Sequence, residues 1–420
     1  MFRSTTFFPA IAALAISAAA QAQTAQFIPL GDLPGGAFRS SATAISHDGL
    51  AIVGYSDGEA QENNVMPFLW TEAGGMLALG HPPIGTQRVT KPFGVSDRGN
   101  VIVGRTNLTA TTGAAWTWTP LAGFTILDDL PGGSENASAL AVSADGTRIT
   151  GNGSSDDIGF GAVLWSNSIT PISLGELPGG AVTSVATNIS ADSSTIVGYS
   201  DSTNGREAFR WTAQQGMLGL GDLPGDPFHS RAYAVNNDGS IIAGFGFSEG
   251  NLREAMRWTE ATGMQPLGDI PGGAFFSLVN AIDDRGIVAV GVGTSSPSLF
   301  EHEAMVWRPG QGMRALREVL MTDYAIDLTA WTLEEAFDIS GDGLSIVGSA
   351  INPDGNSEGF LIRFIPCEAD LNADLITDFF DVQLFLNRYA AGDPAADFNT
   401  DGTIDFFDLQ DYLNAYASCS

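Results

Sequence analysis

A short phrase recurs at near-constant spacing through most of the chain, and it restricts the possible folds more than any other feature. Its fullest form is the Leu-Gly-Asp-Leu-Pro-Gly of residues 220–225. The first leucine of the phrase recurs at intervals of 46 to 49 residues. Periods of this length are typical of repeat architectures, in which each repeat is one supersecondary unit. The aligned leucines are Leu30, Leu79, Leu127, Leu174, Leu220, Leu267 and Leu316.

Each period contains four short runs that are typical of strands. In the fourth period they are residues 184–190, 193–199, 208–212 and 216–218. Alternating, β-branched and aromatic runs separated by Gly, Pro, Asp and Asn predict strands joined by tight turns. A glycine closes the second run, at Gly54, Gly104, Gly151, Gly198, Gly244, Gly291 and Gly348. A tryptophan marks the third run, at Trp70, Trp118, Trp165, Trp211, Trp258 and Trp307.

Seven such periods of about 47 residues predict a mainly β chain that forms a seven-bladed β-propeller. Residues 27–30 have the phase of a fourth strand, whereas the last period stops at residues 364–366 without one. The N-terminal strand would therefore complete the last blade and remove an exposed sheet edge. Residues 317–331 form an insertion with helical character. An open β-solenoid is the alternative, because a period alone does not prove a ring.

Residues 1–22 have the pattern of a secretory signal peptide. Arg3 precedes an apolar run over residues 7–20, and Ala20-Gln21-Ala22 provides a cleavage site. A membrane anchor is the alternative, but the apolar run is shorter than the roughly 20 residues of a spanning helix. We therefore expect a secreted protein, extracellular or associated with the cell surface. The expected division is a signal peptide at 1–22, a propeller at 24–366 and a small domain at 367–420.

The charge of the chain excludes one class of partner. The formal net charge is −30, and Lys91 is the only lysine. Nucleic acids and anionic membranes are bound through clusters of Lys and Arg, so we expect neither as a partner. Divalent cations and neutral or cationic ligands remain compatible with this charge.

Two acidic segments after Cys367 repeat the same pattern. Residues 370–381 and 397–408 are offset by 27 residues and carry the same types of side chain at positions 1, 3, 5, 9 and 12. Alternate side-chain oxygens with a position-7 carbonyl are typical of an EF-hand-like calcium site. The expected ligands are Asp370, Asn372, Asp374, Ile376, Asp378 and Asp381 in the first loop, and Asp397, Asn399, Asp401, Thr403, Asp405 and Asp408 in the second. A solvated acidic surface is the alternative, but it does not explain two copies.

The two loops differ at position 6. Gly402 supplies the sharp turn of the second loop, whereas Leu375 stands at this place in the first. We therefore expect a firm calcium site at 397–408 and a weaker one at 370–381. Cys367 and Cys419 bracket the small domain, and in an exported protein such a pair suggests a disulfide. Two free buried thiols are the alternative.

The marker phrase, the Ile-Val-Gly strand and Trp331-Thr332-Leu333 resemble the HAF repeat of exported bacterial proteins over residues 27–363. In the second period His81-Pro82-Pro83 replaces the usual phrase. This resemblance implies export and a repeat fold, and it implies no activity.

The paired loop and helix units resemble the dockerin domain over residues 367–420, in a cysteine-flanked, GC-type variant whose disulfide could join the two ends. The resemblance implies a calcium-folded module that attaches an exported protein to a cohesin-like or other surface receptor. It also implies that the phenylalanines at loop positions 10 and 11 contact that receptor. Burial in the core is the alternative for these side chains, which are Phe379, Phe380, Phe406 and Phe407.

The repeats themselves contain no recognisable catalytic set. Most markers contain one acid, which could bind calcium or sugar hydroxyls or act in glycoside cleavage. The alternative is that each acid caps its own turn, and the uniform repetition favours this structural role. These acids are Asp32, Asp129, Glu176, Asp222 and Asp269. The four histidines have no zinc-site spacing. Periodic tryptophans indicate packing between blades, so the nonperiodic Trp116 and Trp331 are the better candidates for a ligand platform.

These features favour a noncatalytic secreted protein that binds or displays, with polysaccharide as a candidate ligand of the propeller. A carbohydrate-active enzyme, a glycoside hydrolase or lyase, is the first alternative because propellers host such activities. A structural envelope protein is the second. An enzyme would require a carboxylate pair at nonequivalent blade positions facing one channel.

Overall fold

The structure is a computed structural model that describes residues 24–58, 64–85, 89–133, 135–155, 159–167, 169–250, 252–298, 301–372 and 377–419. The chain divides into two compact units, one formed by residues 25–365 and the other containing residues 366–420. The expected signal peptide, residues 1–22, lies outside the described residues and stays a prediction. Among the helices described, none is both long and apolar enough to pass through a membrane.

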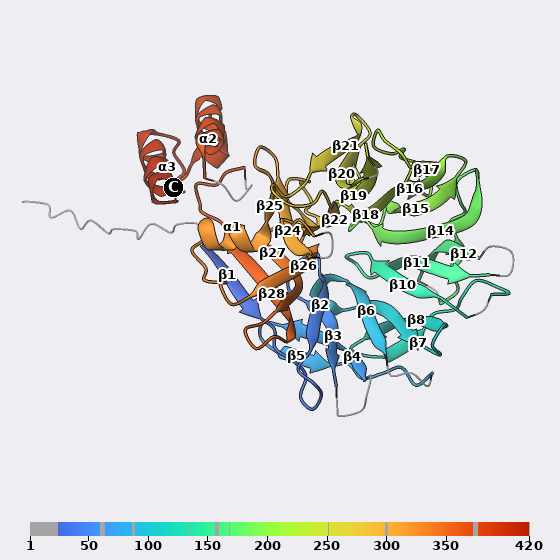
Figure 1. The fold of residues 1–420 in the computed structure, drawn as a ribbon. Helices are drawn as coiled ribbons and strands as arrows, with labels where there is room; N and C mark the ends of the chain where they lie inside the picture. The colour runs from blue at the N-terminus through green and yellow to red at the C-terminus, as the bar shows by residue number, and fades with distance from the viewer. Residues whose placement is uncertain are drawn as a thin grey trace, which may run out of the picture. The chain divides into compact units, whose positions relative to one another are not determined.

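Residues 25–365 form antiparallel sheets in which consecutive strands are neighbours (Figure 1). Two of them are β2–β5 (Ser40–Ile45, Ile52–Asp57, Val65–Thr71, Gly75–Ala78) and β6–β9 (Thr90–Val95, Ile102–Asn107, Gly113–Thr119, Gly123–Ile126). Two others are β18–β21 (Ser230–Val235, Ile241–Ser248, Leu252–Thr259, Gly263–Gly268) and β22–β25 (Ser277–Ile282, Ala289–Gly293, Glu303–Arg308, Gly312–Ala315). This part of the chain is mainly β and β-propeller-like.

The remaining strands are arranged slightly differently. Strands β10–β13 (Ser138–Val142, Arg148–Ser154, Phe160–Ser166, Ile172–Ser173) and β14–β17 (Gly179–Ile189, Ile196–Ser202, Gly205–Thr212, Gly216–Gly219) join into one larger sheet. The link is a single parallel pairing of Phe160 with Thr183. The last sheet is β26 (Thr332–Ile339), β27 (Ser345–Ile351), β28 (Ser357–Ile365) and β1 (Thr24–Pro29). Strand β1 pairs with β28, so the N-terminus supplies the fourth strand of this sheet.

The short helices lie outside this strand pattern. In the first unit they are the 3-10 turn η1 (Asp97–Gly99) and α1 (Leu316–Thr322). Helix α1 covers only the start of the insertion in which helical character was expected, and its Val319 and Leu320 are buried. The second unit contains α2 (Phe379–Ala391), η2 (Pro394–Ala396) and α3 (Phe406–Cys419).

The glycine that closes each Ile-Val-Gly run makes room for a large side chain on the third strand. A Cβ atom at Gly54 would collide with Phe68, and one at Gly104 would collide with Trp116. Phe68 and Trp116 are both fully buried. Trp116 therefore fills the core position that Phe68 fills in the preceding sheet. The prediction that Trp116 offers a ligand platform is wrong, because its indole has no free surface.

The periodic tryptophans pack as the sequence predicts, in clusters that combine residues of adjacent sheets. These residues are Trp70, Trp118, Trp165, Trp211, Trp258 and Trp307. The other candidate platform, Trp331, is partly buried and packs edge-on against Phe27 at 4.9 Å between ring centroids.

Hydrogen bonds connect the turn after the first strand of each sheet to the same turn in the next sheet. The Asp97 amide donates to the Ala144 carbonyl, at 3.0 Å, and the Ala144 amide donates to the Ala191 carbonyl, at 3.3 Å. Other links in this series run from Asp192 to Asn237, Asn236 to Asp284, Asp284 to Gly341, Gly341 to His47 and Asp48 to Asp97. The link from Gly341 to His47 connects the last sheet to the first.

The marker acid stabilises its own repeat. Asp129 Oδ1 accepts hydrogen bonds from the amides of Leu130 (2.8 Å) and Ser154 (2.7 Å). Its Oδ2 accepts from the Asn136 amide and the Ser154 hydroxyl, both at 2.8 Å. The carboxylate therefore ties the marker turn to the second strand of the sheet. The equivalent Asp32, Asp222 and Asp269 also accept hydrogen bonds from their own repeats, whereas Glu176 is exposed.

Removing one of these carboxylates should weaken the first unit. In Asp129→Ala, the amides of Asn136 and Ser154 lose their acceptor. We expect the free energy of unfolding to fall by about 3 kcal/mol, because each buried unsatisfied donor costs roughly 1–3 kcal/mol. Urea unfolding measures this change. Glu260→Ala, at an exposed position, is the control. Equal stability of the two variants would contradict the structural role of the marker acid.

Candidate calcium-binding and docking site

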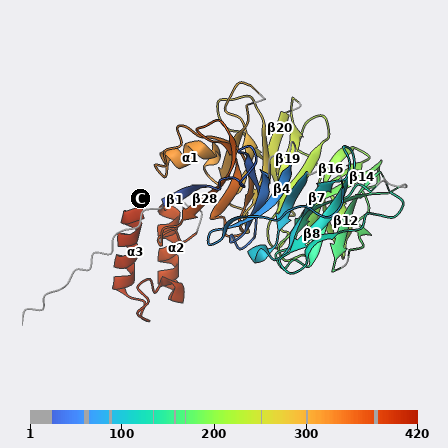
Figure 2. The ribbon, with the colours of Figure 1, turned by 90° about the horizontal axis from the view of Figure 1, so that it is seen from below.

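The second unit is built around a stacked aromatic pair. The helices α2 and α3 lie side by side (Figure 2). Phe385 of α2 and Tyr412 of α3 are fully buried, and their rings stack with centroids 4.2 Å apart and an interplanar angle of 1°. The two residues hold equivalent places in the two loop and helix repeats. The repeats therefore pack against each other through the same position.

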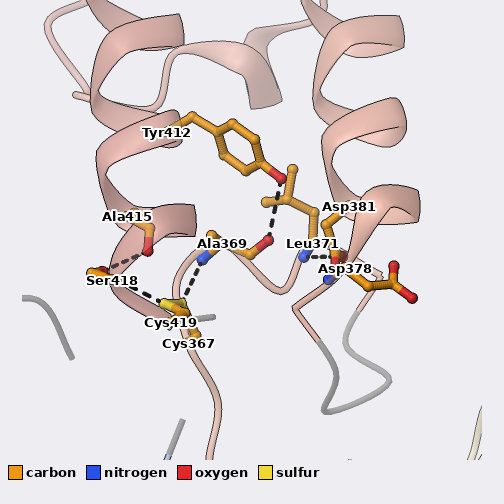
Figure 3. Close-up of a disulfide and its surroundings, with 9 residues drawn as sticks. All are labelled: Cys367, Ala369, Leu371, Asp378, Asp381, Tyr412, Ala415, Ser418 and Cys419. Carbon is orange, nitrogen blue, oxygen red and sulfur yellow. Dashed lines mark hydrogen bonds between the residues drawn. A yellow bond between two sulfur atoms is a disulfide. The ribbon is translucent and has the colours of Figure 1, made fainter. Parts of the chain in front are cut away.

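The carboxylate at position 12 is buried in both loops. Asp381 accepts hydrogen bonds at Oδ1 from the Leu371 amide (2.9 Å) and at Oδ2 from the Asp378 amide (2.9 Å) (Figure 3). Its Oδ1 also accepts from the Asn372 amide at 3.1 Å. Such bonds compensate for the loss of water around a buried acid. The carboxylate thereby closes the loop onto the start of α2.

The second loop repeats this arrangement. Asp408 Oδ1 accepts from the Asn399 amide at 3.2 Å, and Oδ2 accepts from the Asp405 amide at 2.8 Å. Hydrogen bonds from backbone amides, that of Asp405 above all, hold the pKa of the Asp408 carboxyl below its ordinary value. This carboxylate therefore stays ionised at neutral pH, as a cation ligand must.

The other side chains of the second loop also face its backbone. Asp397 Oδ2 accepts from the Gly402 amide at 2.9 Å, and Asp401 Oδ1 accepts from the Thr403 amide at 2.8 Å. Asn399 Oδ1 accepts from the Asp401 amide at 3.0 Å. Gly402 has a φ of +86°, a conformation that favours glycine. The expected ligands thus lie along one tight turn.

The donor set of this loop fits calcium in its chemistry. Carboxylate, amide and carbonyl oxygens are the hard ligands that Ca²⁺ prefers. In the described part of the chain, however, no three His, Cys, Asp or Glu side chains are gathered into a group that could hold a metal ion. The acids of the second loop are instead directed to loop amides.

The first loop can be followed only in part. Asp370 is buried, and Asp378 accepts a hydrogen bond from the Phe380 amide as the N-cap of α2. The backbone amide of Asn372 donates to the position-12 carboxylate of Asp381. The expected ligands Asp374 and Ile376, and Leu375 between them, lie outside the described residues. The expectation of a weaker first site therefore stays a prediction.

Four phenylalanines at loop positions 10 and 11 are exposed to solvent. The exposed fractions are 68% for Phe379, 63% for Phe380, 65% for Phe406 and 62% for Phe407. None of the four belongs to the core, so the alternative of burial does not hold. Large exposed apolar side chains in pairs are typical of an interaction surface.

A disulfide joins Cys367 and Cys419, whose Cα atoms are 6.1 Å apart (Figure 3). Both residues belong to the core cluster of this unit. The Cys367 sulfur accepts a hydrogen bond from the Ala369 amide at 3.2 Å. The Tyr412 hydroxyl lies 3.5 Å from the Ala369 carbonyl, to which it donates. The start of the unit is thereby fastened to the end of α3.

The first unit has a central cavity that the sequence did not indicate. Its volume is about 410 Å³, and the first strands β2, β6, β10, β14, β18, β22 and β26 all line it. Each of these strands has a β-bulge next to the cavity. Bulges redirect side chains and are common beside binding sites. The lining includes Phe93, Tyr233 and Phe337 as aromatic groups.

Two carboxylates lie among the cavity-lining residues at nonequivalent positions of their repeats. Asp284 Oδ2 is 2.8 Å from His47 Nε2, and this contact raises the pKa of the His47 imidazole. Asp338 accepts hydrogen bonds from the amides of Ile45 and Ile339, each at 2.9 Å. Burial nevertheless raises the pKa of Asp338 to about 7. Each carboxylate is therefore engaged with a protein group.

The comparisons with known proteins give likenesses of fold only. No protein-family model and no curated protein matches the sequence. TolB from Acinetobacter baumannii is 13% identical, with a TM-score of 0.42 over 66% of this chain and 62% of its own. Hydrazine synthase from Kuenenia stuttgartiensis is 12% identical, with a TM-score of 0.43 over 80% of this chain and 96% of its own. A prolyl endopeptidase is 10% identical, with a TM-score of 0.48 over 78% of this chain and 50% of its own.

This chain therefore spans less than two thirds of the length of TolB and of the endopeptidase. With TM-scores below 0.5, none of these likenesses bears on what the chain binds or catalyses.

Proposed function

We propose that residues 25–365 form a closed β-propeller with seven blades, of the HAF-repeat type. Two observations support it. The first strand of every repeat lines the same cavity. The hydrogen-bonded turns also lead from sheet to sheet and return from Gly341 to His47. An open solenoid would have no such return contact between its ends.

We propose that residues 366–420 form a dockerin-like calcium module. The observation that carries this proposal is the repeated arrangement of Asp381 and Asp408. In each loop the position-12 carboxylate accepts from the amides of positions 3 and 9, so these contacts are the same in the two loops. Calcium would be held by the second loop through Asp397, Asn399, Asp401, Asp405, Asp408 and the Thr403 carbonyl. Its charge would offset the mutual repulsion of these acids.

The exposed phenylalanines give this module its role. Phe379, Phe380, Phe406 and Phe407 occupy equivalent places at the starts of α2 and α3. They would enter an apolar surface of a cohesin-like or other receptor at the cell surface or in an extracellular complex. Calcium would act by ordering the loops that present them.

The protein as a whole would then be secreted, noncatalytic and bound to a surface by its C-terminal module. Its propeller would bind or display, with polysaccharide as the candidate ligand. The cavity favours binding over catalysis, because Asp338 is held by two amides and Asp284 by His47. A glycosidase needs one carboxyl free to donate a proton and a second to act as nucleophile or base.

The calcium proposal is tested by replacing one ligand. In Asp401→Ala we expect calcium affinity at the second site to fall at least about tenfold, since a charged ligand of a hard cation is lost. Asp374→Ala should cost less, because Leu375 weakens the first loop. Asp411→Ala, an exposed acid on α3, is the control and should bind like the native protein. Calorimetric titration with calcium measures all three. Equal losses for Asp374→Ala and Asp401→Ala would contradict the ranking, and absence of calcium binding by the native protein would contradict the module.

A further inference from the structure

Three arginines alternate with aromatic rings across neighbouring sheets of the first unit. The Arg231 guanidinium carbon lies 4.5 Å from the ring centroid of Tyr199 and 5.9 Å from that of Phe245. Arg253 lies 4.7 Å from Phe245 and 5.2 Å from Phe276. Arg206 extends the series on the other side, 5.3 Å from Tyr199. We call Arg206, Tyr199, Arg231, Phe245, Arg253 and Phe276 the arginine ladder.

Among the residues that the structure describes, two of the three arginines form no ion pair with an acid. Arg206 pairs with Asp201 at 2.9 Å. Arg231 instead donates to His229 Nε2 at 3.2 Å and contacts the Tyr233 hydroxyl at 3.5 Å. Within the described ranges no ion pair joins Arg231 or Arg253 to a carboxylate, and the buried Arg253 Nε has no hydrogen-bond partner. A buried donor of this kind costs free energy unless water or a ligand accepts its hydrogen bond.

Other arginines of the described residues, such as Arg210 and Arg257, also have no ion pair and have a buried Nε without a hydrogen-bond partner. The ladder is distinguished from them by the clustering of three guanidinium groups among aromatic rings. His229 is neutral and adds no further positive charge, since burial and the three arginines lower its pKa to about 4. Burial also lowers the pKa of Arg253. The ladder thus gathers three guanidinium groups, of which one, Arg206, is paired with an acid in the described residues.

The ladder adjoins the central cavity through one residue. Tyr233 lines the cavity, and its hydroxyl contacts Arg231. A ligand that reaches the ladder could therefore also contact the cavity wall.

We propose that the arginine ladder binds a carboxylate or sulfate group on an otherwise neutral glycan, an inference that rests on the proposed binding function of the propeller. The guanidinium fork matches these planar or tetrahedral oxyanions with two parallel hydrogen bonds. The aromatic rings hold the forks in place through cation–π contacts. The net charge of −30 repels a densely charged polyanion, which makes nucleic acid or a polyuronate a poor ligand. An isolated acidic group avoids this repulsion.

The test compares matched sugars on the full native chain. Calorimetry is carried out with three cello-oligosaccharides of equal length that differ only in the terminal sugar, which is glucuronate, glucose 6-sulfate or neutral glucose. We expect at least one acidic ligand to bind at least tenfold more tightly than its neutral counterpart. The carboxylate and sulfate arms identify which oxyanion is preferred.

Variants then locate the binding. Arg231→Gln and Arg253→Gln should each lower the ratio of acidic to neutral ligand affinity at least tenfold. Arg231→Lys should recover little of this ratio, because lysine lacks the guanidinium fork. Arg210→Gln, which removes an arginine outside the ladder, is the control and should bind like the native protein. Thermal unfolding of each variant shows that it is folded. The proposal would be overturned if Arg231→Gln and Arg253→Gln were both folded and bound the acidic oligosaccharide as tightly as the native protein does.

The remaining outcomes separate this inference from the proposed function. Equal binding of acidic and neutral sugars would overturn the ladder as an oxyanion site and leave the binding function intact. If acetate or inorganic sulfate alone bound as tightly as the acidic oligosaccharide, the sugar would contribute nothing to binding. The ladder would then be a simple anion site, and the assignment of a glycan ligand would be overturned. Cleavage of the oligosaccharides would overturn the proposed function itself.

Discussion

Between about pH 4 and pH 8, the free energy of unfolding of the native protein is expected to fall by up to about 4 kcal/mol more than that of Asp338→Ala. Burial raises the pKa of this carboxyl from 3.8 to about 7. Below pH 4 both the folded and the unfolded chain carry the proton. Between the unfolded pKa of 3.8 and the folded pKa of about 7, only the folded chain carries the proton on Asp338. The free energy of unfolding therefore falls as pH rises, until the folded carboxyl ionises near pH 7.

The sequence offers a matched set of controls for this prediction. Other repeats have alanine at the equivalent position, as at Ala44 and Ala141, so the substitution is compatible with the strand. Asn188 also occupies this position and accepts from the Ile189 amide at 2.8 Å, but it does not titrate. Asn188→Ala should therefore leave the pH profile of stability unchanged. Denaturant unfolding at a series of pH values gives these profiles. Parallel profiles for the native protein and Asp338→Ala would contradict the shifted pKa.

Phe385→Ala is expected to unfold the C-terminal unit while leaving residues 25–365 folded. Phe385 is fully buried, stacks on Tyr412 at 4.2 Å and meets Phe398 edge-on at 6.2 Å. Removing a buried phenylalanine costs about 3–5 kcal/mol. A unit as small as residues 366–420 has little more stability than this to lose. Hydrogen exchange and limited proteolysis would detect selective loss of protection in this unit.

Phe379→Ala is the matched control, since it removes the same side chain from the same helix at an exposed position. Its expected effect on stability is within about 0.5 kcal/mol. Equal protection in the two variants would mean that Phe385 does not hold the helices together.

The strands could be predicted from the sequence because their signals are local and repeated. The marker, the Ile-Val-Gly run and the tryptophan keep one phase, and so place strand and turn without knowledge of the tertiary structure. The phase of residues 27–30 likewise predicted a strand that could complete the last sheet, where β1 now pairs with β28. The burial of Trp116 was not predicted because the residues at its position in the other repeats are not tryptophan. Phe68 and Phe209 fill the same core position, which only alignment of the third strands reveals.

Burial in the small unit could be predicted only in part. The spacing of the apolar residues 379, 382, 386 and 389 is that of one side of a helix, which would predict their burial, yet Phe379 and Leu386 are exposed. The buried positions of α2 are instead Asp381 and Phe385. Hydrophobic spacing does not predict a carboxylate in the core, because the loop amides that compensate it come from another segment. Asp408 of the second loop is likewise a buried carboxylate that accepts a hydrogen bond from a loop amide.

The cavity and the arginine ladder were beyond prediction for a different reason. Arg231, Phe245 and Arg253 meet through pairing of strands, but Tyr199 and Phe276 come from the sheets on either side. The packing of consecutive sheets against one another brings these residues together. A net charge of −30 also averages over the whole chain and conceals a local cationic cluster.

The measurement that tests the proposed binding function most directly uses the native chain on a panel of insoluble and soluble polysaccharides. Retention of the protein and release of new reducing ends are followed in the same samples. A noncatalytic propeller is expected to be retained on at least one polysaccharide, with no reducing ends released above the protein-free control. Release of sugars would contradict this function and make Asp338 and Asp284 the first carboxylates to replace. Absence of both retention and release would also contradict it and leave a structural role.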